Sequence, residues 1–109
     1  MNFDEYQNRA SQTAIYPDRG NNLAYPVLGL NGEAGEVAEK LKKVIRDHGG
    51  AISDDARRAM AKELGDVLWY VAACCDELSI SMSDVASANI DKLFARKEKG
   101  KIGGSGDDR

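Results

Sequence analysis

Four acidic residues form two pairs, each with the spacing of about one helical turn. Glu33 and Glu36 make the first pair, and Glu63 and Asp66 make the second. Residues three apart lie on the same side of an α-helix, so each pair directs two carboxylates the same way. The Gly49–Gly50 pair is a natural helix end, and it is equidistant from positions 33 and 66 and from 36 and 63. Two helices folded back there would bring the four carboxylates together.

A cluster of four carboxylates is best explained by a divalent metal site. The alternative is a solvated helix surface with i,i+4 ion pairs, and Glu36–Lys40 and Glu39–Lys43 fit it. The other three acids have an apolar or aromatic residue four positions on, and two of them border the apolar run LGDVLWYVAACC, where a free carboxylate is costly. Carboxylate oxygens are hard ligands that suit Mg²⁺, or Mn²⁺ in its place. We therefore expect the two acidic pairs to hold Mg²⁺.

The composition is that of one small globular domain. The chain has 109 residues, of which 42% are apolar and 30% charged, with a formal net charge of −3. It lacks the basic block that would suit a nucleic acid polymer, and no apolar run approaches the roughly 18 residues of a membrane span. The N-terminus is polar and acidic, unlike a signal peptide, so we expect a cytoplasmic protein. Residues 1–99 should form the domain, and the glycine-rich tail 100–109 should be disordered.

Apolar periodicity predicts an all-α fold, a four-helix-type bundle with helices at about 2–15, 23–48, 54–78 and 83–97. Ser53 and Ser81 should cap the last two helices. The second helix should turn inward Val27, Leu30, Ala34, Val37, Leu41, Val44 and His48. The fourth should turn inward Met82, Val85, Ala86, Ile90, Leu93 and Phe94.

Three glycines, Gly29, Gly32 and Gly35, surround the first acidic pair. Each costs up to about 1 kcal/mol in a helix interior relative to alanine. Two interpretations are equally supported by the sequence. Either a ligand approaches the backbone closely there, or another helix packs tightly against it.

The two central helices are apolar over more than one face. The second adds Leu28, Ala38 and Ile45 to its inward row, and the third adds Ala61, Trp69, Tyr70, Ala72, Ala73 and Cys74. A lone chain of this size has little with which to cover such helices, and large exposed apolar patches usually mark an interface. We therefore expect a homo-oligomer, at least a dimer, in which a neighbouring subunit completes the site.

Several other site chemistries find little support. Cys74 and Cys75 are adjacent in a helical run, so a disulfide or a shared metal would need unusual geometry, and buried thiols are the better interpretation. His48 is the sole histidine and lies at a predicted helix end, which leaves no basis for a histidine-dependent nucleophilic triad. A di-iron carboxylate bundle would need Glu-x-x-His pairs, and none of the glutamates in the two acidic pairs has a histidine three residues on.

Three segments resemble a known family. GLNGEAGEVAEKLKK, KELGDVLWYVAA and ANIDKL are similar to the MazG-like group of the all-α NTP pyrophosphatase superfamily, and the resemblance covers about residues 3–97. It implies a single-domain, Mg²⁺-dependent hydrolase that converts a nucleoside triphosphate to its monophosphate and pyrophosphate, and a homodimer or tetramer. The family's Asn and Lys of NxxKL bind nucleotide and phosphate, and Asn89 and Lys92 occupy those positions.

The candidate substrate-binding residues also have plainer explanations. Asn89 falls on the apolar side of its helix, where a buried structural hydrogen bond would explain the amide as well as a ligand contact does. Lys92 by itself would pass as a surface lysine. Trp69 shares a helix face with Asp66, so it would either stack on a base beside the metal or only pack in the core.

The expected mechanism is attack of water on the α-phosphorus, with pyrophosphate as the leaving group. Glu36 or Glu63 is the candidate general base. Lys92, with Lys40 or Arg19, would stabilise the outgoing charge. Two alternatives stay open: a pyrophosphatase for another nucleotide, such as a phosphoribosyl-ATP-like substrate, and a non-enzymatic helical interaction module, which leaves the clustered carboxylates unexplained.

Overall fold

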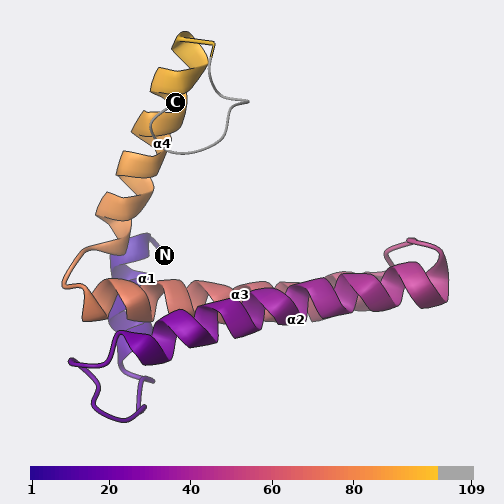
Figure 1. The fold of residues 1–109 in the computed structure, drawn as a ribbon, viewed down its shortest axis with the longest axis horizontal. Coiled ribbons are helices and arrows are strands. Elements are labelled where there is room, and N and C mark those ends of the chain that lie inside the picture. Colours follow the sequence, from indigo (N-terminus) through magenta and orange to yellow (C-terminus); the bar gives the residue numbers. More distant parts are fainter. Residues whose placement is uncertain (101–109) are drawn as a thin grey trace.

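The computed structural model describes residues 1–100, which form four α-helices and no strand (Figure 1). They are α1 (Phe3–Ser11), α2 (Ala24–His48), α3 (Asp54–Glu77) and α4 (Met82–Glu98). The all-α prediction is confirmed, and α2, α3 and α4 begin and end within one residue of their predicted bounds. The predicted disordered tail, 100–109, lies outside the described residues except for Gly100. None of the helices between residues 1 and 100 is long and apolar enough to cross a membrane.

Local capping residues account for the starts of α3 and α4 and for the end of α2. The Ser53 hydroxyl accepts a hydrogen bond from the Ala56 N–H at 3.1 Å, and the Ser81 hydroxyl accepts one from the Asp84 N–H at 3.3 Å. Both serines satisfy N–H groups that have no partner inside the helix. At the other end of α2, Gly49 adopts the left-handed conformation with φ 61°, which glycine adopts without strain. The predicted caps and the predicted turn are therefore confirmed.

The first helix is shorter than the predicted 2–15, because the chain leaves the helix after Ser11. The Thr13 hydroxyl donates to the Ala10 carbonyl at 2.7 Å and accepts from the Trp69 indole N–H at 2.8 Å. Ala14 is buried although it lies beyond the helix. A contact with α3, distant in sequence, thus sets the path of this segment in place of another helical turn.

The buried core lies where α1, α3 and α4 meet. Ala72, Cys75 and Met82 form its centre, and four partly buried residues pack around them: Tyr6, Ala10, Leu68 and Val71. Cys74 and Cys75 are free thiols whose pKa values are raised by burial, in agreement with the expected structural role.

Gln7 joins α1 to the short link between α3 and α4. Its amide donates to the Asp76 carboxylate at 2.8 Å and to the Ile80 carbonyl at 3.0 Å, and it accepts from the Met82 N–H at 2.7 Å. All the polar atoms of one side chain are therefore used to fix the start of α4.

The four helices do not close into a bundle within one chain. α2 and α3 form a long antiparallel hairpin, while α4 turns away from it and, among the residues described, contacts only α1 and α3 (Figure 1). Of the inward faces predicted from the sequence, α2 buries only Val44 and α4 only Met82. Leu41, Ile90 and Phe94 are 40%, 51% and 58% exposed. A single chain offers no second layer to cover these faces.

Candidate active site

In the α2–α3 hairpin, an aromatic ring of α3 packs directly on a glycine of α2. A Cβ atom built on Gly29 would lie 2.1 Å from Cε1 of Tyr70, so no side chain fits between them. Nothing lies within 4 Å of the corresponding positions on Gly32 and Gly35. Gly29 therefore serves tight helix packing, one of the two interpretations offered by the sequence, while the backbone at the other two glycines faces open space.

Three of the four predicted metal ligands come together across the α2–α3 hairpin. Glu33, Glu63 and Asp66 each offer a carboxylate oxygen, and these oxygens lie within 4.8 Å of one another. Glu33 and Glu63 are half-buried, and Asp66 is exposed. The pKa of Glu33 is raised, first by burial, then by its hydrogen-bonding contact with Glu63 and by the negative charges of Asp66, Glu63 and Glu36. Like charges held this close favour either a shared proton or a bound cation.

Glu36 is not one of the three converging residues. Its side chain is exposed, although its charge still contributes to the raised pKa of Glu33. Of the four acidic residues predicted as ligands, three therefore come together, and the fourth acts on Glu33 through its charge.

Lys40 provides a positive charge at the boundary of the cluster. Its Nζ atom lies 3.9 Å from Oε1 of Glu63, across the hairpin. In the other lysine pair considered from the sequence, Glu39 contacts Lys42 at 3.0 Å in place of Lys43. One nearby ammonium does not balance three carboxylates, and the donor set consists of hard oxygens. These residues fit a divalent metal of the Mg²⁺ or Mn²⁺ type.

A pocket of about 300 Å³ opens beside the carboxylates and is lined by Glu33, Asp66, Trp69 and Tyr70. The two aromatic rings meet edge to face, with centroids 5.0 Å apart and an interplanar angle of 84°. The pKa of Tyr70 is raised, mainly by burial, then by the Tyr25 hydroxyl and by the charges of Glu33 and Asp66. Trp69 therefore lines the same pocket as Glu33 and Asp66.

Tyr70 was missed as a pocket residue in the sequence analysis. The signal was present, because position 70 is four residues after Asp66 and so shares its helix face.

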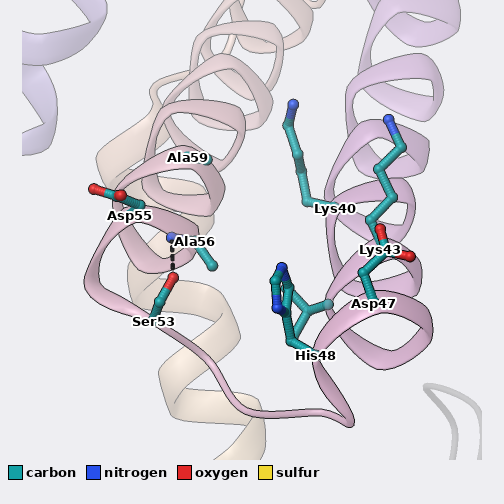
Figure 2. A pocket seen from close by; sticks show the side chains of 9 residues that line it. Lys40, Lys43, Asp47, His48, Ser53, Asp55, Ala56 and Ala59 are labelled. Carbon is teal, nitrogen blue, oxygen red and sulfur yellow. Dashed lines mark hydrogen bonds between the residues drawn. The ribbon is translucent and has the colours of Figure 1, made fainter.

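A second pocket, of about 440 Å³, lies at the closed end of the hairpin (Figure 2). It contains none of the four acidic-pair residues, but Lys40 lines it together with Lys43 and His48. In Figure 2 the His48 ring lies in the gap between the two helices, whereas Asp55 points to the outer side of α3. Lys40 thus links the two sites, because it lines this pocket and also contacts Glu63 of the carboxylate cluster.

The remaining predicted substrate-binding residues lie elsewhere in the chain. Asn89 and Lys92 belong to α4, which has no contact with α2 among the residues described, and Asn89 is exposed. The expectation that Asn89 is buried on an apolar face is therefore wrong for a single chain. Arg19 donates to the Ala14 carbonyl at 3.3 Å and lines a separate pocket beside Glu77.

Comparison with known proteins identifies the family of the chain. The family model described as the MazG nucleotide pyrophosphohydrolase domain matches residues 24–100, which include α2, α3 and α4 with all four acidic-pair residues. The chain belongs to the MazG family. Its sequence is 47% identical over 114 residues to the Gene 37 protein of Mycobacterium phage L5, and the match covers all of both chains. No solved structure matches.

Membership identifies the MazG domain as a nucleotide pyrophosphohydrolase by class. The family typically depends on a metal, and this MazG domain carries an acidic cluster of three carboxylates.

Proposed function

We propose that this MazG domain hydrolyses a nucleoside or deoxynucleoside triphosphate to its monophosphate and pyrophosphate. The observation that carries the proposal is the convergence of Glu33, Glu63 and Asp66 beside a pocket walled by Trp69 and Tyr70. Carboxylates suit the metal that a phosphate chain requires, and aromatic rings suit a nucleobase. The two halves of a nucleotide thus have matching surfaces next to each other.

Electrostatics makes a divalent cation necessary for this reaction. A triphosphate carries up to four negative charges, and two unit charges 4 Å apart interact by about 4 kcal/mol at an effective dielectric constant of 20. Glu33, Glu63 and Asp66 would hold Mg²⁺, or Mn²⁺, with Glu36 at the edge of the set. When bound, the cation neutralises part of the phosphate charge and makes the α-phosphorus a better electrophile.

The side chains of the domain supply the remaining steps. Glu63 or Glu36 accepts a proton from the attacking water as the water oxygen bonds to the α-phosphorus. The bond from the α-phosphorus to the bridging oxygen breaks, and pyrophosphate leaves with that oxygen. Lys40, 3.9 Å from Glu63, places a positive charge where the leaving group develops negative charge.

The aromatic wall would bind the base. Trp69 is held by its hydrogen bond to Thr13, and Tyr70 is held against Gly29, so neither ring needs to be ordered when the nucleotide arrives. Stacking between these rings and the nucleotide leaves the identity of the base to other contacts.

A second copy of the chain would supply those contacts. On α2, an apolar groove of about 460 Å³ is lined by Ala38, Leu41 and Ile45, and Leu28 is 71% exposed. On α4, Ile90 and Phe94 are both more than half exposed. Among the residues described, α4 does not contact α2 of the same chain. A homo-oligomer of at least two chains would bury both surfaces and would bring Asn89 and Lys92 of one copy toward the pocket of another.

The assembly is tested by light scattering at micromolar concentration combined with activity. We expect a species larger than the 11.8 kDa chain, and specific activity that falls on dilution together with the mass. A monodisperse, fully active monomer would show that the assembly is not needed.

The reaction is tested by a substrate screen. The purified protein is incubated with each ribo- and deoxyribonucleoside triphosphate in Mg²⁺ or Mn²⁺, and the products are resolved. In H₂¹⁸O, attack at the α-phosphorus places the label in the monophosphate, whereas attack at the β-phosphorus places it in pyrophosphate. Formation of a diphosphate and phosphate, or turnover unchanged in the Glu63→Gln variant, would refute the proposal.

A further inference from the structure

Glu77, near the end of α3, lies outside the carboxylate cluster and makes the densest set of long-range hydrogen bonds to the segment between α1 and α2. Its Oε1 atom accepts from the Tyr16 hydroxyl at 2.5 Å and from the Gly20 N–H at 2.9 Å. Its Oε2 atom accepts from the Asn22 N–H at 3.3 Å. These bonds lower the pKa of Glu77, with Tyr16 as the largest cause, so the carboxylate stays charged in the fold.

The connecting segment is built to present these donors. Gly20 has φ 94°, a left-handed conformation that side-chain-bearing residues rarely adopt, and it aims its N–H at Glu77. The Asn22 side chain donates to the Pro17 carbonyl at 2.8 Å and accepts from the Tyr25 N–H at 3.1 Å. The loop is therefore closed on Glu77 and continues directly into the first turn of α2.

A continuous series of aromatic contacts leads from Glu77 to the pocket. The Tyr16 ring is 8% exposed and stacks on Tyr25, with centroids 4.6 Å apart and an interplanar angle of 7°. The ring centroid of Tyr25 in turn lies 6.4 Å from that of Tyr70. The Tyr70 ring packs on Gly29 and lines the pocket. The other end of the same segment is joined to the pocket through the bond between Thr13 and Trp69.

We propose that Glu77 is a positioning residue for the active site, which acts by holding Tyr16 so that Tyr25 fixes Tyr70 as a rigid wall for the base. The proposal rests on the proposed function, since it assigns the aromatic wall to nucleotide binding. Glu77 itself touches no reacting group: it lies 11 residues beyond Asp66, about 16 Å along the helix axis. Its effect should therefore fall on nucleotide binding and leave the chemical step intact.

The experiment compares Glu77→Ala with Glu39→Ala as a matched control. Glu39 is also a glutamate whose pKa is lowered chiefly by one partner, Lys42, and neither of these two residues lines the pocket. Glu77→Gln keeps an acceptor for Tyr16 and Gly20 and loses the charge. Tyr16→Phe keeps the ring stack and removes only the donor, so it tests the idea even where Glu77→Ala fails to fold.

Two measurements are made on each variant. Trp69 is the sole tryptophan of the chain, so acrylamide quenching of its fluorescence without nucleotide reports the order of the pocket wall. We expect quenching to rise in Glu77→Ala, less in Glu77→Gln and Tyr16→Phe, and not at all in Glu39→Ala. With the best nucleotide, KM should rise roughly tenfold in Glu77→Ala while kcat changes little, as expected for lost uniform binding.

The two hypotheses fail separately. Absence of nucleotide turnover in the wild-type protein would overturn the proposed function, and the quenching data would still decide whether Glu77 orders the pocket. Suppose that a folded Glu77→Ala variant has a lowered melting temperature but unchanged quenching and KM. That result would overturn the positioning role and would show that Glu77 only stabilises the loop. A fall in kcat with KM unchanged would also overturn it.

Discussion

Replacing Gly29 by alanine would create a steric overlap between the new methyl group and the Tyr70 ring. The added carbon would lie 2.1, 2.4 and 2.6 Å from three ring atoms, closer than non-bonded carbons approach. Tyr70 cannot simply turn away, because its ring also meets Trp69 at 5.0 Å and Tyr25 at 6.4 Å. The helices must separate or the whole aromatic wall must shift.

The size of the effect follows from two opposed terms. Alanine is favoured over glycine in a helix interior by about 1 kcal/mol, whereas overpacking costs roughly 1–3 kcal/mol. Gly29→Ala should therefore lose up to about 2 kcal/mol of unfolding free energy. Gly32→Ala and Gly35→Ala add a carbon that meets nothing within 4 Å, so each should gain up to about 1 kcal/mol.

The measurement is denaturation of the three variants by urea, followed by circular dichroism, with the oligomeric state of each checked beforehand. Gly29→Ala should fall below Gly32→Ala by about 1–3 kcal/mol, or roughly 4 °C or more in melting temperature. If Gly29→Ala and Gly32→Ala gain stability equally, Tyr70 does not pack on Gly29. The register described for the hairpin and the position of Tyr70 in the pocket wall would then both be refuted.

Three further predictions concern the carboxylates. Glu63→Gln should abolish most turnover while its melting temperature in EDTA stays equal or rises, because like-charge repulsion is relieved; a near-wild-type rate would remove Glu63 from the site. Mg²⁺ or Mn²⁺ should stabilise the wild-type fold by about 2.7 kcal/mol at a concentration 100 times the Kd, and Asp66→Asn should lose most of that shift; a wild-type melting curve indifferent to both ions argues against the metal site. Because the pKa of Glu33 is raised in the fold, its contribution to stability is present below its unfolded value of 4.5 and is lost as pH rises through the folded value. Glu33→Gln without metal should thus gain on the wild type between pH 4.5 and neutrality, and a stability difference that is constant with pH would contradict the raised pKa.

The features predicted well from the sequence are those encoded by neighbouring residues. Ser53 and Ser81 cap helices through bonds to residues three positions away, and Gly49 ends α2 through its own backbone freedom. The register of the hairpin follows from the same turn, since Gly29 and Tyr70 are equidistant from the diglycine, as Glu33 and Asp66 are. Hence three of the four carboxylates converge as expected.

The features that were missed depend on contacts between distant segments. α1 ends early because Thr13 bonds to Trp69, 56 residues away. The apolar stripe of α4 predicts a helix but not the direction in which it runs, and Asn89 is exposed as a result. Tyr70 was overlooked because an aromatic residue in an apolar run looks like core, although its spacing from Asp66 puts it on the helix face that lines the pocket.

The three bonds of Gln7 have a consequence for the order in which the chain acquires its structure. The contacts between α2 and α3 join residues that are closer in sequence than those between α1 and the end of α3, so the hairpin should form before α1 docks. α1 leaves the ribosome earliest, yet the groups that receive it, from Asp76 to Met82, are made about 70 residues later. The first helix therefore cannot dock until the start of the last one has been made. Pulse-labelled hydrogen exchange during refolding should find the amides of α1 and of the start of α4 protected together, after those of the hairpin.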